Sequence, residues 1–339
     1  MSKEIKRANH YIPKTYLEKF QNNQGVLYVY KKGEKFFKKG ITKEKRILTV
    51  FGKGGLDKIA VKKDLYIPTG EFIKDRNILE DLFCDEFETK YNAFIGDLQN
   101  ENISFGRIIE KHQEYIINLI ASVFSRTLHS KKELEEMYKA NIQTYHKIRS
   151  MNQKWNRERI KSLKDNLRKK KPELSEQKIN ESTQDYFKMI EEGKFEVNFP
   201  RNRFIKEMIM RMQMFTQIIS DMTIQVLKNK TSFPFITSDA PVVYFVPKVK
   251  VNFYFGPKSL GGPYTELYFP LTKNLCLLLT RRKTRILDYV YITQGNLARL
   301  VNYNIAHNSR DFIFSPEKNT FLDEFIEKYI PYPFKIKIS

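Results

Sequence analysis

The 339-residue sequence lacks the features that would place it in several common classes. It has only two cysteines, Cys84 and Cys276, which are too few for a disulfide framework and do not have the spacing of metal ligands. No apolar run reaches the roughly 18 residues that cross a bilayer, and the polar first residues do not form a signal peptide. We therefore expect a cytoplasmic protein in a reducing compartment, with no membrane contact.

Familiar catalytic motifs are also missing. The sequence contains no GxxxxGK[ST] phosphate-binding loop, no HExxH zinc motif, no GxSxG nucleophile elbow and no paired CxxC. A reaction, if there is one, must therefore be argued from less specific groups of residues.

Acidic residues are scarce relative to basic ones. Lysine and arginine total 60 and aspartate and glutamate 39, so the net charge is +21. The codon bias of an AT-rich genome explains many lysines, but it also favours acidic residues and so does not explain the excess. A polyanion is the expected partner of such a chain, and we favour nucleic acid, RNA over DNA.

The basic residues are concentrated in two segments. Residues 147–171 hold eleven basic and two acidic residues, and residues 31–46 hold eight and two. In the second segment, Phe36 and Phe37 either stack on bases or pack a hairpin, and we favour packing. In the first segment the alternative to a binding surface is a solvated helix end without a partner. The residues predicted to contact nucleic acid are Lys14, Trp155, Arg157, Arg159, Lys164, Arg168, Lys169, Lys170 and Lys171.

Hydrophobic patterning predicts an α+β fold. Residues 1–76 have the β-branched and aromatic runs of strands, residues 77–230 have helical spacing and contain the basic insert 147–171, and residues 231–339 return to strands. We expect the two flanking parts to form one mixed or antiparallel sheet, with the central helices as a large insertion. One helix is predicted to run from about residue 105 past Arg126, and another from Pro200 through Val226.

Two short segments carry the best candidates for chemistry. Asn9-His10-Tyr11-Ile12-Pro13 places a histidine beside the start of a helix, where it can act as general acid or base. Thr237-Ser238-Asp239-Ala240-Pro241 places a carboxylate at the end of an apolar strand. The structural alternatives are a partly buried histidine and a turn or cap before the proline.

These two segments resemble the opening and the second recurrent motif of the bacterial family catalogued as domain of unknown function 4238. Glu80, Glu88 and Arg126 also fit that family's pattern. Two residues depart from that pattern. The family often has Asn where this chain has Ala240, and Gln or Arg where it has Lys14. The resemblance assigns no activity, but it implies a variable, defence-like gene neighbourhood. It therefore favours a nucleic-acid-directed effector of an anti-phage defence or toxin-like system.

The leading hypothesis is a nuclease whose site combines His10, Glu88, Arg126 and Asp239. His10 would be the general acid or base, and Arg126 would stabilise the phosphoryl oxygens. Asp239, with Glu88, would hold a divalent metal such as Mg²⁺ or orient the nucleophile. A reaction without metal would point to RNA.

Two alternatives stay open. In one, the protein binds or senses nucleic acid without cutting it, and His10 and Asp239 hold each other in a buried ion pair. In the other, it is a toxin or regulator that acts on a protein partner, or a homo-oligomer, through the methionine-rich run Met208–Met214. That run is more typical of a helix packed in a core.

Overall fold

The computed structural model describes residues 5–32, 36–38, 41–45, 47–70, 75–100, 102–246, 260–282 and 289–328. Contacts within it divide the chain into two compact units, Met1–Ser130 with Arg201–Ser339, and Lys131–Pro200. The basic segment 147–171 falls wholly in the second, smaller unit. The three-part division at residues 77 and 231 stays a prediction.

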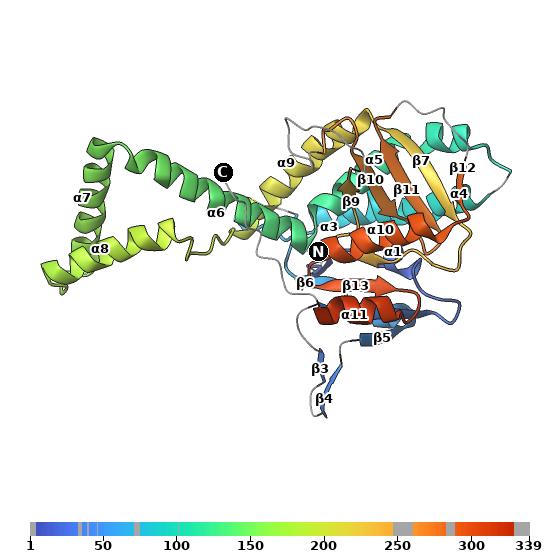
Figure 1. Ribbon diagram of the computed structural model, residues 1–339, viewed down its shortest axis with the longest axis horizontal. Helices are drawn as coiled ribbons and strands as arrows, with labels where there is room; N and C mark the ends of the chain where they lie inside the picture. Colours follow the sequence, from blue (N-terminus) through green and yellow to red (C-terminus); the bar gives the residue numbers. More distant parts are fainter. Residues whose placement is uncertain are drawn as a thin grey trace. The chain divides into compact units, whose positions relative to one another are not determined.

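The larger unit contains two main sheets (Figure 1). The five-stranded sheet has the order β12-β7-β11-β10-β9, with one parallel pair, and the four-stranded antiparallel sheet has the order β5-β2-β13-β8. Two further strand pairs are β1-β6 and β3-β4. The strands are β1 (Ala8–His10), β2 (Val26–Lys31), β3 (Phe36–Lys38), β4 (Ile41–Lys45), β5 (Ile47–Phe51), β6 (Val61–Lys63), β7 (Thr223–Asn229), β8 (Thr237–Ser238), β9 (Val243–Phe245), β10 (Glu266–Pro270), β11 (Leu275–Thr280), β12 (Tyr289–Ile292) and β13 (Phe312–Ser315).

The four-stranded sheet confirms the expected α+β fold. Its strands β2 and β5 come from the N-terminal part of the chain, and β8 and β13 come from the C-terminal part. The core lies mainly at the other sheet, where every residue of β10 and β11 is buried. A strand covered on both faces is apolar along nearly its whole length, as residues 275–279 of β11 are.

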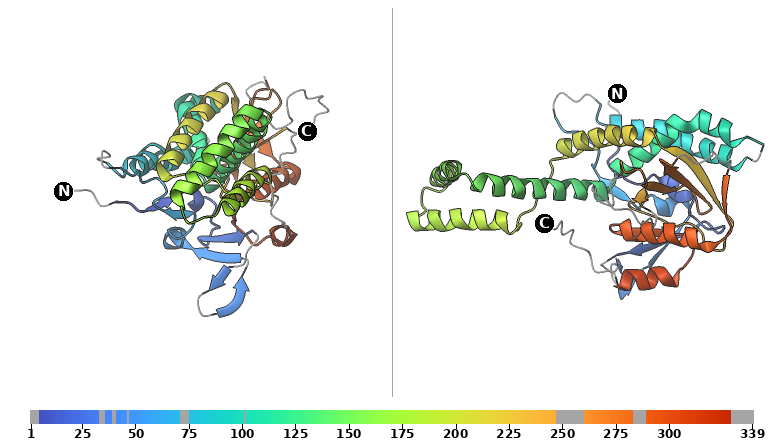
Figure 2. Two further views of the ribbon diagram at one scale, coloured as in Figure 1. Left: turned by 90° about the vertical axis from the view of Figure 1, so that its left-hand side faces the viewer. Right: turned by 45° about the horizontal axis from the view of Figure 1, so that its top comes forward.

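Helices cover both faces of the larger sheet. Figures 1 and 2 show α10 on one side of it and α5 with α9 on the other. The rings of Phe124 and Phe215 stack at 4.0 Å and join α5 to α9. The helices are α1 (Lys14–Glu18), α2 (Gly52–Leu56), α3 (Ile78–Phe83), the π-helical turn η1 (Cys84–Glu88), α4 (Thr89–Gln99), α5 (Phe105–Ser125), α6 (Leu128–Ser150), α7 (Gln153–Lys170), α8 (Glu176–Glu191), α9 (Arg201–Ser220), α10 (Gly295–Asn308) and α11 (Thr320–Lys328).

Two of the predicted helices differ from the structure. The helix from residue 105 stops at Ser125, and α6 begins at Leu128 after Thr127 accepts a hydrogen bond from the Ser130 N–H at 3.0 Å. The helix after Pro200 ends at Ser220, and the expected helical residues up to Val226 belong to β7 instead. Pairing with β11 and β12 on either side holds this β-branched segment extended.

The smaller unit is helical. Helix α8 returns along α6, because the Gln143 amide donates to the Ile190 carbonyl at 3.2 Å and the His146 ring lies 5.4 Å from Phe187. Arg159 of α7 lies over the Phe187 ring at 5.2 Å. These contacts hold α7 against the end of the α6–α8 pair.

Candidate functional site

Three of the four predicted catalytic residues share one polar environment in the larger unit. Arg126 Nη2 lies 3.6 Å from Glu88 Oε1. The charge of Arg126 also lowers the pKa of His10, although burial of the ring lowers it more. The structure therefore pairs Glu88 with Arg126 and places His10 within the electrostatic field of Arg126. We call these three residues the cluster.

Arg126 occupies the break between α5 and α6 and is only 1% exposed. The Tyr66 hydroxyl donates to its backbone carbonyl at 2.7 Å, and its guanidinium lies 4.9 Å from the Phe83 ring centre. Among the described residues, its Nε, Nη1 and Nη2 have no hydrogen-bond partner. A buried guanidinium with unused donors is costly, so it has a strong capacity to bind anionic oxygens.

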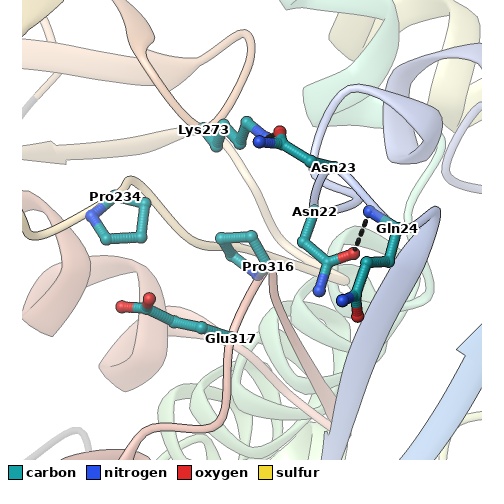
Figure 3. A pocket seen from close by; sticks show the side chains of 7 residues that line it. All are labelled: Asn22, Asn23, Gln24, Pro234, Lys273, Pro316 and Glu317. Atoms are coloured by element: carbon teal, nitrogen blue, oxygen red, sulfur yellow. Dashed lines mark hydrogen bonds between the residues drawn. The ribbon is translucent and has the colours of Figure 1, made fainter.

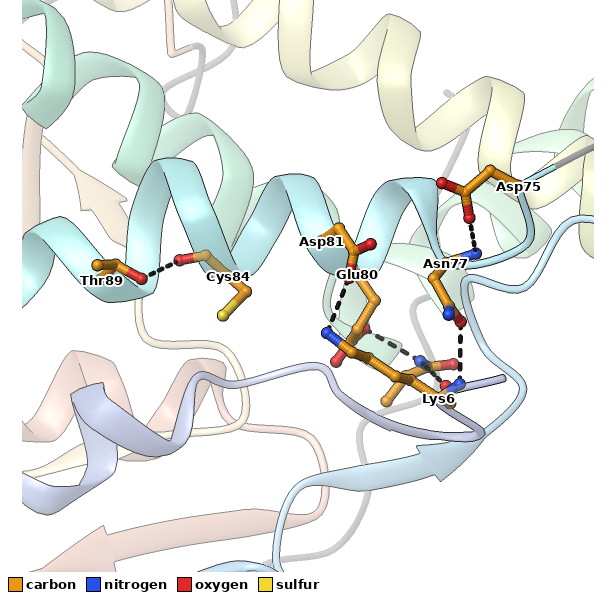
Figure 4. A network of polar contacts seen from close by, with 8 residues as sticks. Lys6, Asp75, Asn77, Glu80, Asp81, Cys84 and Thr89 are labelled. Carbon is orange, nitrogen blue, oxygen red and sulfur yellow. Dashed lines mark hydrogen bonds and ion pairs between the residues drawn. The ribbon is translucent and has the colours of Figure 1, made fainter. Parts of the chain in front are cut away.

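Glu80 completes the cluster. The Asn9 amide donates to Glu80 Oε2 at 3.0 Å and to the Lys6 carbonyl, and Asn9 Oδ1 accepts from the Tyr66 N–H at 3.2 Å. Figure 4 shows Glu80 on its helix beside Lys6, which pairs with the neighbouring Asp81. Asn9 is completely buried. The sequence indicated Glu80 only through the family pattern and did not predict it as a site residue. Its partner Asn9, which lies in the N-terminal motif, is the residue that could have pointed to it.

The π-helical turn η1 sets the direction of Glu88 relative to Glu80. In an α-helix with 3.6 residues per turn, two positions eight residues apart are offset by roughly 80° around the axis. The wider π turn reduces that offset, because more residues fill each turn. The turn is fixed by the Thr89 hydroxyl, which donates to the Cys84 carbonyl at 2.9 Å, and by the Tyr115 hydroxyl, which donates to the Phe87 carbonyl at 2.8 Å. Glu88 thus lies 3.6 Å from Arg126, and both carboxylates lie within the field of the Arg126 charge.

The protonation of this cluster is shifted toward neutral forms. Burial raises the pKa of Glu80 to about 6, while Arg126 opposes the shift and Glu88 adds to it. Burial also raises the pKa of Glu88, again opposed by Arg126. The pKa of His10 is lowered, so its ring is neutral near pH 7. His10, whose pKa is lowered, suits the role of proton acceptor, and Glu80, whose pKa is raised, suits the role of proton donor. Together they suit acid–base chemistry.

Asp239 lies in a neighbouring polar group and is held by the main chain. Its Oδ1 accepts from the Arg310 N–H at 2.8 Å, and its Oδ2 accepts from the Asp311 and Phe312 N–H groups at 2.7 and 3.1 Å. Burial raises its pKa to about 6, although these hydrogen bonds oppose the shift. The negative charges of Asp239 and Asp311 further raise the pKa of Tyr11. Asp239 thus fastens the end of β8 to the start of β13.

Alternate residues of the N-terminal motif, Asn9 and Tyr11, face the two polar groups. Asn9 hydrogen-bonds Glu80, and Tyr11 lies within the field of Asp239. Lys32 belongs to the second group, where it donates to the Ala306 and Ser309 carbonyls at the end of α10 at 3.0 and 2.6 Å.

The described residues include no group of three or more His, Cys, Asp or Glu side chains that could hold a metal ion. Glu80 and Glu88 supply two carboxylates, and both oxygens of Asp239 already accept backbone hydrogen bonds. If a divalent metal such as Mg²⁺ bound here, Glu80 and Glu88 would be its carboxylate ligands, and it would supply charge stabilisation to a phosphoryl group.

The predicted nucleic-acid contacts are divided between the units. Lys14, in the larger unit, pairs with Asp57. In the smaller unit, Arg157, Lys169, Lys170 and Lys171 are exposed, whereas Lys164 and Arg159 are half-buried. The side chain of Trp155 and the residues 33–35, 39, 40 and 46 of the second basic segment, with the side chains of Phe36 and Phe37, lie outside what the structure describes.

A hollow of about 430 Å³ opens elsewhere on the larger unit (Figure 3). Lys273 donates to Asn23 Oδ1 across it at 2.8 Å. The residues that line it are Asn22, Asn23, Gln24, Pro234, Lys273, Pro316 and Glu317. None of the predicted site residues is among them.

Within the described part of the chain, no helix is both long and apolar enough to cross a membrane. Neither the curated proteins nor the solved structures contain a match to this sequence. The motifs around His10 and Asp239 nevertheless lie within the part of the chain that matches a protein-family model. A family model matches residues 8–319, and the chain therefore belongs to the family described as Protein of unknown function (DUF4238).

Proposed function

We propose that the protein is a nuclease that cleaves phosphodiester bonds, RNA in preference to DNA, at the cluster of His10, Glu80, Glu88 and Arg126. One observation carries the proposal. Two carboxylic acids with raised pKa values flank a buried arginine whose guanidinium nitrogens have no hydrogen-bond partner among the described residues.

Each residue then has a role in cleavage of an RNA strand. Neutral His10 accepts the proton of the 2′-hydroxyl as its oxygen attacks the adjacent phosphorus. The bond from phosphorus to the 5′-oxygen breaks, and protonated Glu80 supplies the proton to that leaving oxygen. Arg126 stabilises the charge that develops on the phosphoryl oxygens.

Access to Arg126 is controlled by Glu88. The 3.6 Å separation of Arg126 and Glu88 is longer than a charge-assisted hydrogen bond, which is typically about 2.7–2.9 Å. The Glu88 side chain is 21% exposed, whereas that of Arg126 is 1% exposed. An entering phosphoryl group therefore competes with Glu88 for the guanidinium, and the net charge of +21 favours its approach.

The test is cleavage of end-labelled RNA and DNA with and without Mg²⁺. We expect the parent protein to cut RNA and leave a 2′,3′-cyclic phosphate, and we expect Glu80→Gln and His10→Gln to cut at least 100-fold more slowly. The matched control is Glu114→Gln, an exposed glutamate of α5. RNA and DNA that stay intact under all conditions would refute the proposal.

A second function is favoured by the low exposure of Arg126, because a closed polar cluster can also be structural. In this alternative the protein binds or senses nucleic acid without cutting it. Its expected signature is tight, salt-dependent binding of nucleic acid that remains intact.

A further inference from the structure

Helix α7 carries a regular row of basic residues. Their separations alternate between three and four positions, so they fall on one face of the helix. At 1.5 Å per residue the row is about 25 Å long, with a charge roughly every 5 Å. The cationic stripe consists of Lys154, Arg157, Lys161, Lys164, Arg168 and Lys171. Lys171 continues the helical course, since its N–H donates to the Leu167 carbonyl at 2.9 Å.

Packing fixes the direction in which the stripe faces. Half-buried Ile160, Leu163 and Leu167 form the adjacent face of α7, which carries the apolar side chains. Arg159 lies over the Tyr186 and Phe187 rings of α8 at 5.9 and 5.2 Å. Arg159 thus faces α8 and the apolar side chains are half-buried, whereas most of the stripe is exposed. The stripe therefore lies on the outer side of α7.

Most of the stripe's charge is not neutralised by the protein. Arg168 Nη1 pairs with Asp165, and its Nε and Nη2 form a two-pronged contact with Glu176 at 2.8 and 2.9 Å. Within the described residues, the other five cations form no ion pair. Four of these five are exposed, and Lys164 is half-buried.

The shape of this surface indicates the chemistry of its ligand. A long, straight and evenly spaced row of cations matches a polyanion with regularly repeated charges. An amphipathic helix that binds a lipid surface needs an accessible apolar face, and here that face packs against α8. We infer that the stripe binds the phosphate backbone of a nucleic acid, contacts about five phosphates and does not read the base sequence.

This inference deepens the proposed function and shares with it only the premise that the partner is a nucleic acid. It concerns binding by α7, whereas the proposed function concerns cleavage at Glu80, Glu88 and Arg126. The two can therefore fail separately.

The experiment measures the affinity of the full chain for a roughly 30-nucleotide RNA and for its duplex, at KCl concentrations from about 50 to about 300 mM. The stripe variant replaces Lys154, Arg157, Lys161 and Lys164 with glutamine. The control variant also introduces four glutamines and so removes the same charge as the stripe variant. It replaces four exposed residues of the larger unit, Lys58, Arg107, Lys206 and Lys318. Labelled nucleic acid is recovered after each measurement to record whether it has been cut.

Removing four phosphate contacts should reduce the slope of log K against log salt by about 3.6 for a duplex and about 2.8 for a single strand. We expect this reduction in the stripe variant and a change of less than 1 in the control. Equal reductions in both variants, or no binding by the parent protein, would overturn the inference. Stripe-dependent binding of nucleic acid that stays uncut would support the inference and count against the proposed function. Cleavage with an unchanged slope in the stripe variant would support the proposed function and count against the inference.

Discussion

The Asn9 side-chain amide donates to Glu80 Oε2 at 3.0 Å, although 71 positions separate the two residues. This bond joins the N-terminal motif to the first helix of the cluster. Asn9 is completely buried and its remaining polar atom accepts from the Tyr66 N–H, so its position is fixed by the protein interior. Glu80 therefore has a defined orientation in the absence of any ligand.

Replacing Glu80 with glutamine should stabilise the protein while abolishing cleavage. The folded-state pKa of Glu80 is raised to about 6, above its usual 4.5, so ionisation opposes folding as pH rises through this range. We expect Glu80→Gln to be about 2 kcal/mol more stable than the parent at pH 7.5 and nearly equal to it at pH 4.5. Urea denaturation at both pH values, with Glu114→Gln as control, measures the difference. A gain of equal size at both pH values would contradict the assignment.

Replacing Arg126 with glutamine should have the opposite effect on stability. Without the guanidinium, the partly buried Glu80 and Glu88 lose the charge that opposes their raised pKa values. We expect a loss of about 3 kcal/mol at pH 7.5. The loss should be smaller at pH 4.5, where Glu80 is largely protonated and the raised pKa of Glu88 also favours its neutral form.

Urea denaturation of this variant is compared with that of Arg107→Gln, which removes an exposed arginine of the same region. If Arg126→Gln does not fold at pH 7.5, the comparison is made with Arg126→Lys, which keeps the charge. Equal losses at the two pH values would show that Arg126 acts through packing alone.

Asp239 is expected to contribute mainly to stability. Its replacement by alanine leaves three backbone N–H groups without their acceptor, at Arg310, Asp311 and Phe312. We expect Asp239→Ala to lose about 3 kcal/mol, and Asp311→Ala, at the adjacent half-buried position, to lose less than 1 kcal/mol. Cleavage abolished in a variant of parental stability would instead assign Asp239 a catalytic role.

Shortening the π-helical turn should leave the cluster and the fold intact. Deletion of Asp85 from η1 converts the turn to α-helix and places Glu80 and Glu88 seven positions apart, with an offset of roughly 20° around the axis. The two carboxylates therefore keep similar directions, and we expect RNA cleavage within about threefold of the parental rate and an unchanged far-ultraviolet circular dichroism spectrum. Asp85→Ala, which keeps the turn, should also cleave at the parental rate. A folded deletion variant without activity would show that the π turn does more than align the two carboxylates.

Local sequence patterns predicted much of the fold. Strands such as Leu275–Thr280 and amphipathic helices such as Phe105–Ser125 are identified by hydrophobic spacing, and flanking strands do share one sheet. The segment Thr223–Asn229 was assigned to a helix because helical spacing continues into it. Its strand conformation comes from pairing with β11 and β12, which are distant in sequence.

The cluster was only partly predictable for a related reason. His10, Glu88 and Arg126 stand in recognisable motifs, but the contact between Asn9 and Glu80 is tertiary. The π-helical turn has no sequence pattern of its own, and the break at Arg126 depends on a cap formed by Thr127. The orientation and burial of Glu80 and Glu88 decide their pKa values. Both arise only when segments distant in sequence come together in the fold.

The strand order of the four-stranded sheet also determines when the fold can be completed during synthesis. Strand β13 lies between β2 and β8, so the sheet cannot close until residue 315 has left the ribosome. The Tyr16 hydroxyl likewise waits for Thr237, which lies 2.6 Å from it in the folded chain. The N-terminal motif therefore has no final docking surface on a nascent chain. An effector assembled in this order would not cut the message or the ribosomal RNA of the ribosome that is making it.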